Sequence, residues 1–371
     1  MKKKLYEVIQ DDLLQKINLG IYKADDKLPS EAEIMKQFSV SRVTVRKALS
    51  ELKKNKVVYS NTKNGTFVSS RDIKEKKTHL LIPLVGTLPQ EKNRNTLILD
   101  GIKKVADNNK CVCPFYNTDN RQEKERKILV NLLNYNLDAI IIWPCSGMNN
   151  IDILSIFVIK KIPVVFLDRR PQGFNDILVT TNNFKAMKDL LNKIIAEGYT
   201  KIATTILPEQ SLPEQNRFNG YITALLENNI PLKGEYILGS SDLFRKYYKK
   251  TSKQRLDFLI DYNDFLIDKY LKLTDKPEVI CCPNDNDALN LLYRFKNRFG
   301  EIPKDLIVTG FDNLDFDILS ESPTIEQDFF ALGKVAIEVA LQIINNIRIS
   351  SLIEIDAKPI LRYPPSSRKV K

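Results

Sequence analysis

Apolar positions recur at helical spacing in three stretches near the N-terminus. The pattern over residues 3–19 predicts a helix that ends at Gly20. Ser30, with Glu33 three residues later, forms a capping box that predicts the start of a second helix. Ser41 can cap a third helix. The apolar positions of this third helix fall at i, i+3, i+4 and i+7 and are expected to face a core: Val45, Ala48, Leu49 and Leu52.

The pattern then changes to two β-prone runs, residues 57–60 and 66–69. They are separated by a segment that ends in Asn64-Gly65, which is typical of a hairpin turn. Two short helices joined by a tight turn and followed by a hairpin predict a winged helix-turn-helix over residues 1–70. On the wing, Lys63 and backbone amides can reach a sugar-phosphate edge. Four polar residues follow the exposed side of the third helix: Arg42, Arg46, Ser50 and Lys53.

The charge is concentrated in this N-terminal part. The chain has 57 Lys and Arg against 46 Asp and Glu, which gives a net charge of +11. Residues 1–77 hold 18 basic and 10 acidic side chains, or +8, and the remaining 294 residues hold 39 and 36, or +3. A basic head on a nearly neutral body indicates a phosphate-binding module, with double-stranded DNA as the expected partner.

From residue 78 onward, apolar β-type runs alternate with helical stretches. This alternation predicts a parallel sheet covered on both faces, and about 290 residues are too many for one such sheet. We therefore expect a linker at residues 71–77 and a two-lobed α/β body over residues 78–371. Lobe 1 is predicted at about 78–180 and 328–350, and lobe 2 at about 181–327 and 351–365. The clearest predicted strands are residues 80–85, 112–116, 139–143, 164–167, 202–206, 279–282 and 306–311.

Polar side chains follow several of these strands, where ligands of α/β folds bind. A neutral polyol offers hydroxyls that carboxylate, amide and guanidinium groups can satisfy together. Trp143 offers an indole face on which a sugar ring can stack. A structural role for the carboxylates is an alternative. Asp285 and Asp312 can cap helices, and Asp168 can pair with a neighbouring arginine. The candidate ligand groups are Asp168, Arg169, Arg217, Asn284, Asp285, Asp312 and Trp143.

Composition argues against several other classes of protein. The five cysteines include no C-x-x-C pair, and His79 is the only histidine, which disfavours a zinc site or Ser-His-Asp chemistry. The N-terminus lacks the apolar run of a signal peptide, and no run approaches 18 apolar residues. We expect a cytoplasmic protein that does not bind a membrane, is not an enzyme and has no metal or cofactor.

The N-terminal residues resemble the GntR family of winged helix-turn-helix regulators. The resemblance rests on the segments 27–31, 40–49 and 65–68, which read KLPSE, VSRVTVRKAL and GTFV. It implies that third-helix and wing residues contact DNA, and that Ser41 lies on a phosphate. Many members have Arg where this chain has Ala32, so one usual contact is missing. The expected DNA contacts are Ser41, Arg42, Thr44, Arg46, Lys47, Lys63 and Gly65.

Residues 77–348 resemble the LacI/GalR effector domain, which has the periplasmic sugar-binding fold. The matching pieces include 166–169 (FLDR), 217–221 (RFNGY) and 308–312 (VTGFD). By position, the resemblance implies that Asp168, Arg217, Asn284 and Asp312 contact a sugar. A GntR head on a LacI-like body resembles the arabinose-repressor-type subgroup (AraR), which implies L-arabinose, L-fucose or a similar monosaccharide as effector.

Together these features predict a homodimeric repressor that a monosaccharide releases from its operator. A ligand-dependent activator of the same build remains an alternative. An enzyme fused to a DNA-binding head would need an activated nucleophile or a Schiff-base lysine, of which the sequence gives no sign. The segment 243–269 is longer and more charged than the resemblance leads one to expect, and we predict a surface elaboration there.

Overall fold

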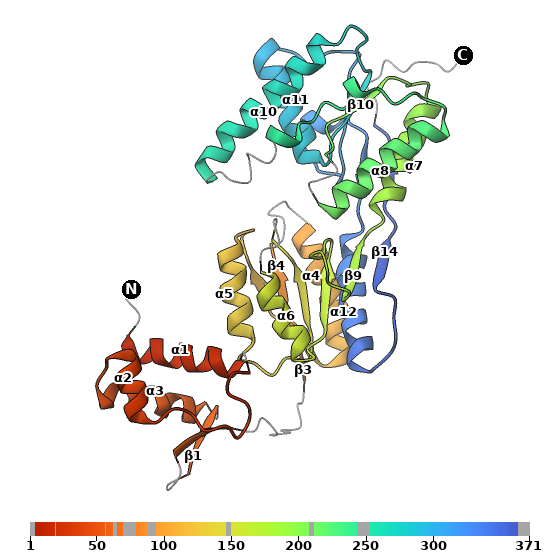
Figure 1. Cartoon of the computed structure of the whole chain (residues 1–371). Helices are drawn as coiled ribbons and strands as arrows, with labels where there is room; N and C mark the ends of the chain where they lie inside the picture. The colour runs from red at the N-terminus through yellow and green to blue at the C-terminus, as the bar shows by residue number, and fades with distance from the viewer. Residues whose placement is uncertain are drawn as a thin grey trace. The chain divides into compact units, whose positions relative to one another are not determined.

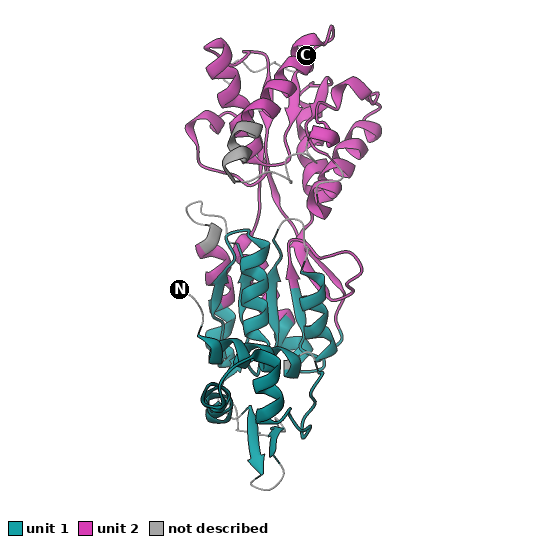
Figure 2. Cartoon of the chain, turned by 60° about the vertical axis from the view of Figure 1, so that its left-hand side comes forward, with its two compact units in different colours: residues 1–89, 103–165, 340–348 teal, residues 90–102, 166–339, 349–371 magenta. Residues whose placement is uncertain are grey.

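The computed structural model forms two compact units, which Figure 2 shows in different colours. The first unit consists of residues 1–89, 103–165 and 340–348, and the second of residues 90–102, 166–339 and 349–371. No helix in the described part of the chain is long and apolar enough to cross a membrane. The structure describes residues 4–18, 20–55, 57–61, 65–69, 79–87, 94–145, 150–207, 211–243 and 252–362.

The N-terminal elements form the predicted winged helix-turn-helix (Figure 1). The two strands pair in antiparallel register, with Val58 opposite Val68. One core takes buried side chains from all three helices and both strands, among them Ile9, Ile34 and Leu52. The elements are α1 (Leu5–Asn18), α2 (Glu31–Phe38), α3 (Arg42–Lys54), β1 (Val58–Asn61) and β2 (Gly65–Val68).

Both predicted helix caps are confirmed. The backbone N–H of Glu33 donates to Ser30 Oγ at 3.3 Å, and the backbone N–H of Ser30 donates to Glu33 Oε2 at 2.7 Å. The hydrogen bonds from Ser30 hold the pKa of Glu33 below its ordinary value. Ser41 Oγ accepts from the backbone N–H of Thr44 at 3.4 Å. These caps satisfy N–H groups that have no partner within the helix, and so they set where α2 and α3 begin.

A six-stranded sheet follows, in the order β14-β9-β8-β7-β4-β6. All four residues of β8 are buried, which is the continuous apolar pattern of a strand covered on both faces. The strands are β4 (Leu84–Gly86), β6 (Phe115–Asn117), β7 (Ile140–Trp143), β8 (Val164–Leu167), β9 (Ile177–Thr181) and β14 (Leu352–Ile355). The helices that follow the first strands are α4 (Arg94–Ala106), α5 (Gln122–Leu132) and α6 (Ile151–Ile159). A 3-10 turn, η1 (Asp107–Asn109), extends α4.

Two predicted strands are each broken in two. Residues 80–85 form β3 (Leu80–Leu81) and β4, and residues 112–116 form β5 (Cys111–Val112) and β6. The register is the same on both sides of the break, so Pro83 lies opposite Pro114. Proline has no N–H to donate, and two prolines at one level interrupt the ladder there.

The second sheet has three parallel strands, β10 (Ile202–Thr204), β11 (Val279–Cys281) and β12 (Ile307–Thr309). Its two faces bury separate cores, since successive side chains of a strand point to opposite faces. One core takes Ile202, Val279 and Ile307, together with apolar side chains of α7 (Asn183–Ala196) and α8 (Leu212–Glu227). The other takes Ala203, Ile280 and Val308, together with side chains of α10 (Ser252–Lys272) and α11 (Asp285–Phe299).

The last part of the chain adds β14 to the six-stranded sheet and also forms a separate two-stranded sheet. β13 (Thr324–Glu326) pairs with β15 (Lys358–Ile360), and α12 (Phe329–Ile344) lies between β13 and β14 in sequence. β14 pairs with β9, in the sheet that contains the strands predicted for lobe 1, whereas the prediction assigned residues 351–365 to lobe 2. Exposed and partly buried residues alternate along this edge strand, so its sequence does not indicate which strand it pairs with. Two short 3-10 turns complete the described elements: η2 (Gly234–Tyr236) and η3 (Asp317–Leu319).

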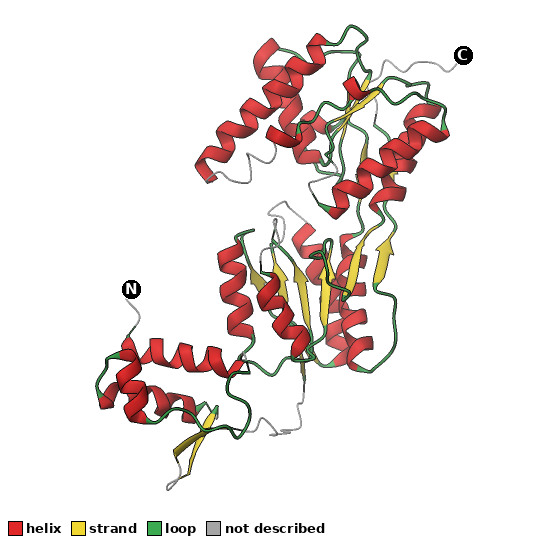
Figure 3. Ribbon diagram, in the orientation of Figure 1, coloured by secondary structure: helices red, strands yellow, loops and turns green. Residues whose placement is uncertain are grey.

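We predicted that the segment 243–269 is a surface elaboration, but part of it is buried in a core. Helix α10, drawn as a helix in Figure 3, covers most of this segment. Leu266 and Ile267 of this helix are buried in the core beside α11. On the same helix, both oxygens of Asp264 accept hydrogen bonds from Arg294 of α11. The prediction was wrong because the many charged residues of this segment obscure the few apolar positions that anchor it.

Helices α4 and α12 approach so closely that only glycine fits at the contact. A Cβ atom on Gly333 would lie 2.1 Å from the carbonyl oxygen of Ile98. We expect Gly333→Ala to lower the free energy of unfolding by about 1–3 kcal/mol, measured by urea denaturation. Gly234→Ala is the matched control, because nothing lies within 4 Å of its Cβ position. A Gly333→Ala variant as stable as this control would contradict the close packing.

Candidate functional site

The outer face of α3 is set by its buried face. Val45, Ala48 and Leu52 are fully buried in the winged-helix core. Because these positions repeat at helical spacing, the arginines of the first turns point away from the core. The Arg42 and Arg46 side chains are 63% and 65% exposed. The structure therefore places both predicted readers on the solvent side of the helix.

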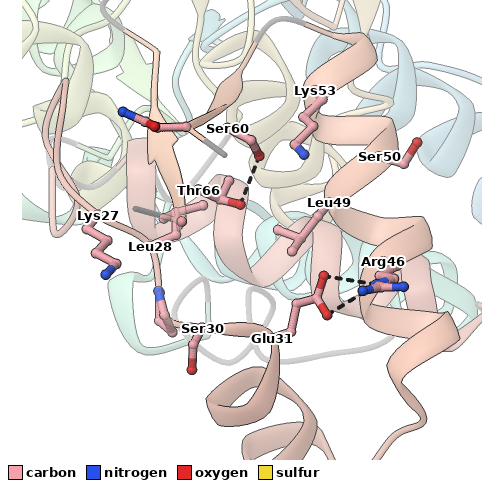
Figure 4. A pocket seen from close by; sticks show the side chains of 13 residues that line it. Lys27, Leu28, Ser30, Glu31, Arg46, Leu49, Ser50, Lys53, Ser60 and Thr66 are labelled. Carbon is pink, nitrogen blue, oxygen red and sulfur yellow. Dashed lines mark hydrogen bonds and ion pairs between the residues drawn. The ribbon is translucent and has the colours of Figure 1, made fainter. Parts of the chain in front are cut away.

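Glu31, the first residue of α2, holds both arginines. Its Oε2 lies 3.1 Å from Arg42 Nε. Its Oε1 lies 3.1 Å from Arg46 Nε, a contact that Figure 4 shows. A guanidinium has five N–H donors in a planar fork, so an ion pair through Nε orients the group without using all its donors. Sequence reasoning gave Glu31 no role in the interface. Its only sequence signal is that it follows the N-cap of α2.

A groove of about 690 Å³ lies beside α3, between the start of α2 and the wing. Lys27, Arg46 and Lys53 bring positive charge to its lining, and the hydroxyls of Ser60 and Thr66 face one another across the wing strands at 3.3 Å (Figure 4). Gly65 starts β2 with a φ of +110°, and a Cβ atom there would lie 3.0 Å from Lys27 Cε. The positive φ favours glycine at this wing position, whereas the flexible Lys27 side chain could move away from a Cβ atom.

The remaining predicted DNA contacts occupy different positions. The hydroxyls of Ser41 and Thr44 lie 3.0 Å apart at the start of α3, so both also serve the local cap. Lys47 Nζ lies 4.3 Å from the centre of the Tyr6 ring on α1, a cation–π contact that directs this side chain toward α1. Lys63 lies outside the described residues.

In the second unit, a buried guanidinium connects several predicted ligand groups. Arg217 of α8 is 6% exposed, and its Nε donates to Asn183 Oδ1 at 2.8 Å. Its Nη1 donates to the carbonyl oxygen of Pro283 at 2.6 Å, and its Cζ lies 3.6 Å from the centre of the Phe311 ring. Pro283 and Phe311 directly precede Asn284 and Asp312. The structure therefore gathers Arg217, Asn284 and Asp312 at the carboxyl ends of β11 and β12.

Asn284 caps α11 and binds a carboxyl group that we had not predicted. Its Oδ1 accepts from the backbone N–H of Asp287 at 2.9 Å, and its Nδ2 donates to Asp287 Oδ2 at 2.9 Å. Burial, followed by the negative charge of Glu214, raises the pKa of Asp287 to about 6. Arg217 and Asn284 act in the opposite direction. Asp287 has no signal in the sequence beyond its place in the first turn of α11.

Asp285 has the structural role that the sequence left open. Its Oδ1 accepts from Thr324 Oγ1 at 2.7 Å, and its Oδ2 accepts from the backbone N–H of Leu314 at 2.6 Å. Gly310 leaves the space that this carboxylate occupies, since a Cβ atom there would lie 1.8 Å from Asp285 Oδ1. Asp285, which is 2% exposed, thereby ties α11 to β13 and to the loop after β12.

Asp312 is linked through one glutamine to a strand of the other sheet. Its Oδ1 accepts from Gln327 Nε2 at 2.5 Å, and Gln327 Oε1 accepts from Thr181 Oγ1 at 2.5 Å. Thr181 is the last residue of β9, and Gln327 directly follows β13. Asp312 has a φ of +127°, and its backbone N–H donates to the carbonyl oxygen of Ile325 at 2.7 Å. This chain of hydrogen bonds runs from a predicted ligand group to the segments that connect the two sheets.

Asp168 and Arg169 pair with each other after β8. Arg169 Nη2 lies 2.7 Å from Asp168 Oδ2, as the structural alternative for Asp168 anticipated. Asp168 is 9% exposed and has a φ of +64°, which is a strained conformation. Thr180 Oγ1 donates a hydrogen bond to the carbonyl oxygen of Asp168 and helps to hold this conformation. Trp143 ends β7 and is half-buried, and a Cβ atom on Gly86 would lie 2.8 Å from its Cβ.

Among the residues that the structure describes, no three His, Cys, Asp or Glu side chains form a group that could hold a metal ion. The polar groups around Arg217 are instead amides, carboxylates and a backbone carbonyl, which form hydrogen bonds with one another or with the Arg217 guanidinium. Such a set can satisfy hydroxyl groups, each of which donates and accepts.

Two family models match separate parts of the chain. Residues 5–68 match the bacterial regulatory proteins of the gntR family. Residues 191–362 match the periplasmic binding protein-like domain. The predicted combination of a GntR-type DNA-binding domain with a LacI-type body is confirmed, as is the α/β fold class.

Relatives extend the match over the whole chain. The arabinose metabolism transcriptional repressor of Geobacillus stearothermophilus is 25% identical over 370 residues, which are 98% of each chain. Catabolite control protein A of Priestia megaterium is 27% identical over 68% of this chain and 72% of its own length. The crystal structure of CcpA of Lactococcus lactis has a TM-score of 0.60 at 18% identity, and the match covers 78% of this chain and all of that one. This structural likeness supports the fold alone.

The raised pKa of Asp287 gives a pH prediction. The folded chain keeps this carboxyl protonated up to about pH 6, whereas the unfolded chain releases the proton near 3.8. Protonation therefore favours folding, and the wild type should lose stability relative to Asp287→Asn as the pH rises from 4 to 7. Urea midpoints at pH 4.5 and 7.5 measure this difference. The same difference between the two proteins at both pH values would contradict the raised pKa of Asp287.

Proposed function

Because this chain combines a GntR-family DNA-binding domain with a periplasmic binding protein-like domain, we propose that it is a transcriptional repressor of sugar metabolism. Helix α3 and the wing bind operator DNA, and the polar groups around Arg217 bind a monosaccharide. The observation that carries the proposal is the pair of exposed guanidiniums on the outer face of α3, held by one carboxylate.

The geometry of α3 suits the major groove. An α-helix fits that groove, and arginine recognises guanine there through two parallel hydrogen bonds. Glu31 pairs with the Nε atoms of Arg42 and Arg46, and both arginine side chains are largely exposed. Lys27 and Lys53, on the two sides of the adjoining groove, place further positive charge where phosphates flank a bound helix.

The chemistry around Arg217 suits a small neutral sugar. Arg217 and Asn183 are buried, and Asn284 and Asp312 are partly buried. Removal of one hydrogen-bond partner from such a site costs about 1–3 kcal/mol, so a few groups suffice to select one polyol. Asp168 and Arg169, which follow β8 in the same unit, are further candidates for the same ligand. The arabinose repressor of Geobacillus stearothermophilus supports a pentose as the first ligand to test, followed by L-fucose.

Ligand binding and DNA binding are linked in this proposal. A sugar that replaces or tightens the hydrogen bond between Asp312 and Gln327 acts on the end of β9 through Thr181. A coupling free energy of about 1–3 kcal/mol would weaken operator binding by a factor of about 5–150. The acting species is a homodimer, whose two winged-helix domains read two half-sites of a near-palindrome. Relatives that are named as repressors favour repression over activation.

The direct test is to select duplexes from a random-sequence pool with the full chain and to measure binding with and without each of a set of monosaccharides. The proposal predicts a defined, nearly palindromic sequence and release by at least one sugar. A pool that yields no preferred sequence would refute the DNA-binding function. Binding that no sugar alters would refute the sugar response.

Arg46→Ala should weaken binding to the selected duplex by about tenfold or more, because it removes a charge-assisted contact on α3. Sugar-induced thermal stabilisation should be unchanged. Arg126→Ala is the matched control, since Arg126 is also an exposed arginine paired with a carboxylate, at 2.7 Å from Asp152, but lies outside the winged helix. Equal DNA affinities of the two variants would contradict the role of Arg46.

Asp312→Ala should bind the selected duplex normally and fail to respond to the sugar. It removes one proposed ligand group and the link to Gln327. The exposed neighbour Asp315 provides the control variant Asp315→Ala, which should respond like the wild type. The sugar concentration that releases half of the DNA measures both. An Asp312→Ala variant released at the wild-type concentration would exclude this carboxylate from the site.

A further inference from the structure

Val43 is a large apolar side chain on the exposed face of α3, and no contact considered so far uses it. It is 77% exposed, although its helix neighbours Val45, Leu49 and Leu52 are buried. In an α-helix successive residues are separated by about 100°, which places Val43 almost directly opposite the middle of the buried stripe. It also lies one residue after Arg42 and three before Arg46. By the same rotation Arg42 and Arg46 both lie to one side of Val43, so Val43 borders the face that carries the two arginines.

Helix stability does not explain a valine at this position. β-branched residues have a lower helix propensity than alanine, lysine or glutamate, and an exposed position offers no packing in return. Valine is, however, held in one preferred side-chain rotamer in a helix. Its two methyl groups are therefore presented outward in a fixed direction, which is useful for contact with an apolar surface of defined position.

We propose that Val43 determines part of the DNA specificity of this chain by contacting the C5-methyl group of a thymine in the major groove. That methyl group is the one apolar feature which the major groove displays, and it distinguishes thymine from cytosine. Arg42 and Arg46 supply hydrogen bonds to neighbouring bases or phosphates, and Val43 lies beside them on the exposed surface of the helix that enters the groove. The inference rests on the proposed DNA-binding function and adds a base preference to it.

The test uses the full chain and a duplex selected by it from a random-sequence pool. Each thymine of one half-site is replaced in turn by deoxyuridine, which removes only the methyl group. At one position the affinity of the wild type should fall about fourfold, the factor that corresponds to burial of one methylene-sized group. Val43→Ala should bind the unmodified duplex about fourfold or more less tightly, and the same deoxyuridine should cause no further loss.

Ile21→Ala is the matched control, because Ile21 is a 60% exposed apolar residue of the same domain outside α3. This variant should keep the wild-type affinity and the wild-type response to deoxyuridine. The inference is overturned if no thymine of the half-site is sensitive, or if Val43→Ala remains as sensitive as the wild type. These outcomes leave selective DNA binding intact, whereas failure to select any duplex would refute the proposed function and this inference together.

Discussion

The burial of one stripe of α3 determines which side of the helix meets the solvent. Val45, Ala48 and Leu52 have no exposed surface, and they pack against α1, α2 and the wing in a core that a domain of this size cannot duplicate. A polar substitution at one of these buried positions would therefore disturb the DNA-binding face of α3, although the substituted residue does not lie on that face. The core sets the orientation of α3, and Glu31 sets the positions of the two arginine side chains on it. One carboxylate holds two guanidiniums that would otherwise repel each other and move independently.

The body uses a buried positive charge in a comparable way. Arg217 contacts the start of α7, the loop after β11 and the ring of Phe311 at once, so it connects elements that are distant in sequence. A buried guanidinium is tolerated only when its N–H groups have acceptors, and here a side-chain amide and a backbone carbonyl serve. The same arrangement orients Asn284 and Asp312. A ligand that inserts between these groups would change a network that reaches Thr181 through Gln327.

Local signals made much of this structure predictable. The caps at Ser30 and Ser41 and the apolar spacing of α3 are properties of a few neighbouring residues, and the structure confirms them. Pairing between distant residues was not predictable in the same way. Neither the contact of Glu31 with Arg42 and Arg46 nor the pairing of β14 with β9 has a local signal in the sequence. The many charged residues of α10 made the burial of Leu266 difficult to predict. The structural role of Asp285 depends on Thr324, a partner distant in sequence, which the residue type alone does not reveal.

Reciprocal linkage between the two binding events is the most direct test of the central claim. A monosaccharide identified by its release of DNA should be titrated calorimetrically into the full chain alone and into its complex with the selected duplex. If the winged helix and the sugar-binding body are energetically coupled, the DNA must weaken sugar binding by the same factor, about 5–150, by which the sugar weakens DNA binding. An equal sugar affinity in the presence and absence of the duplex would contradict the account.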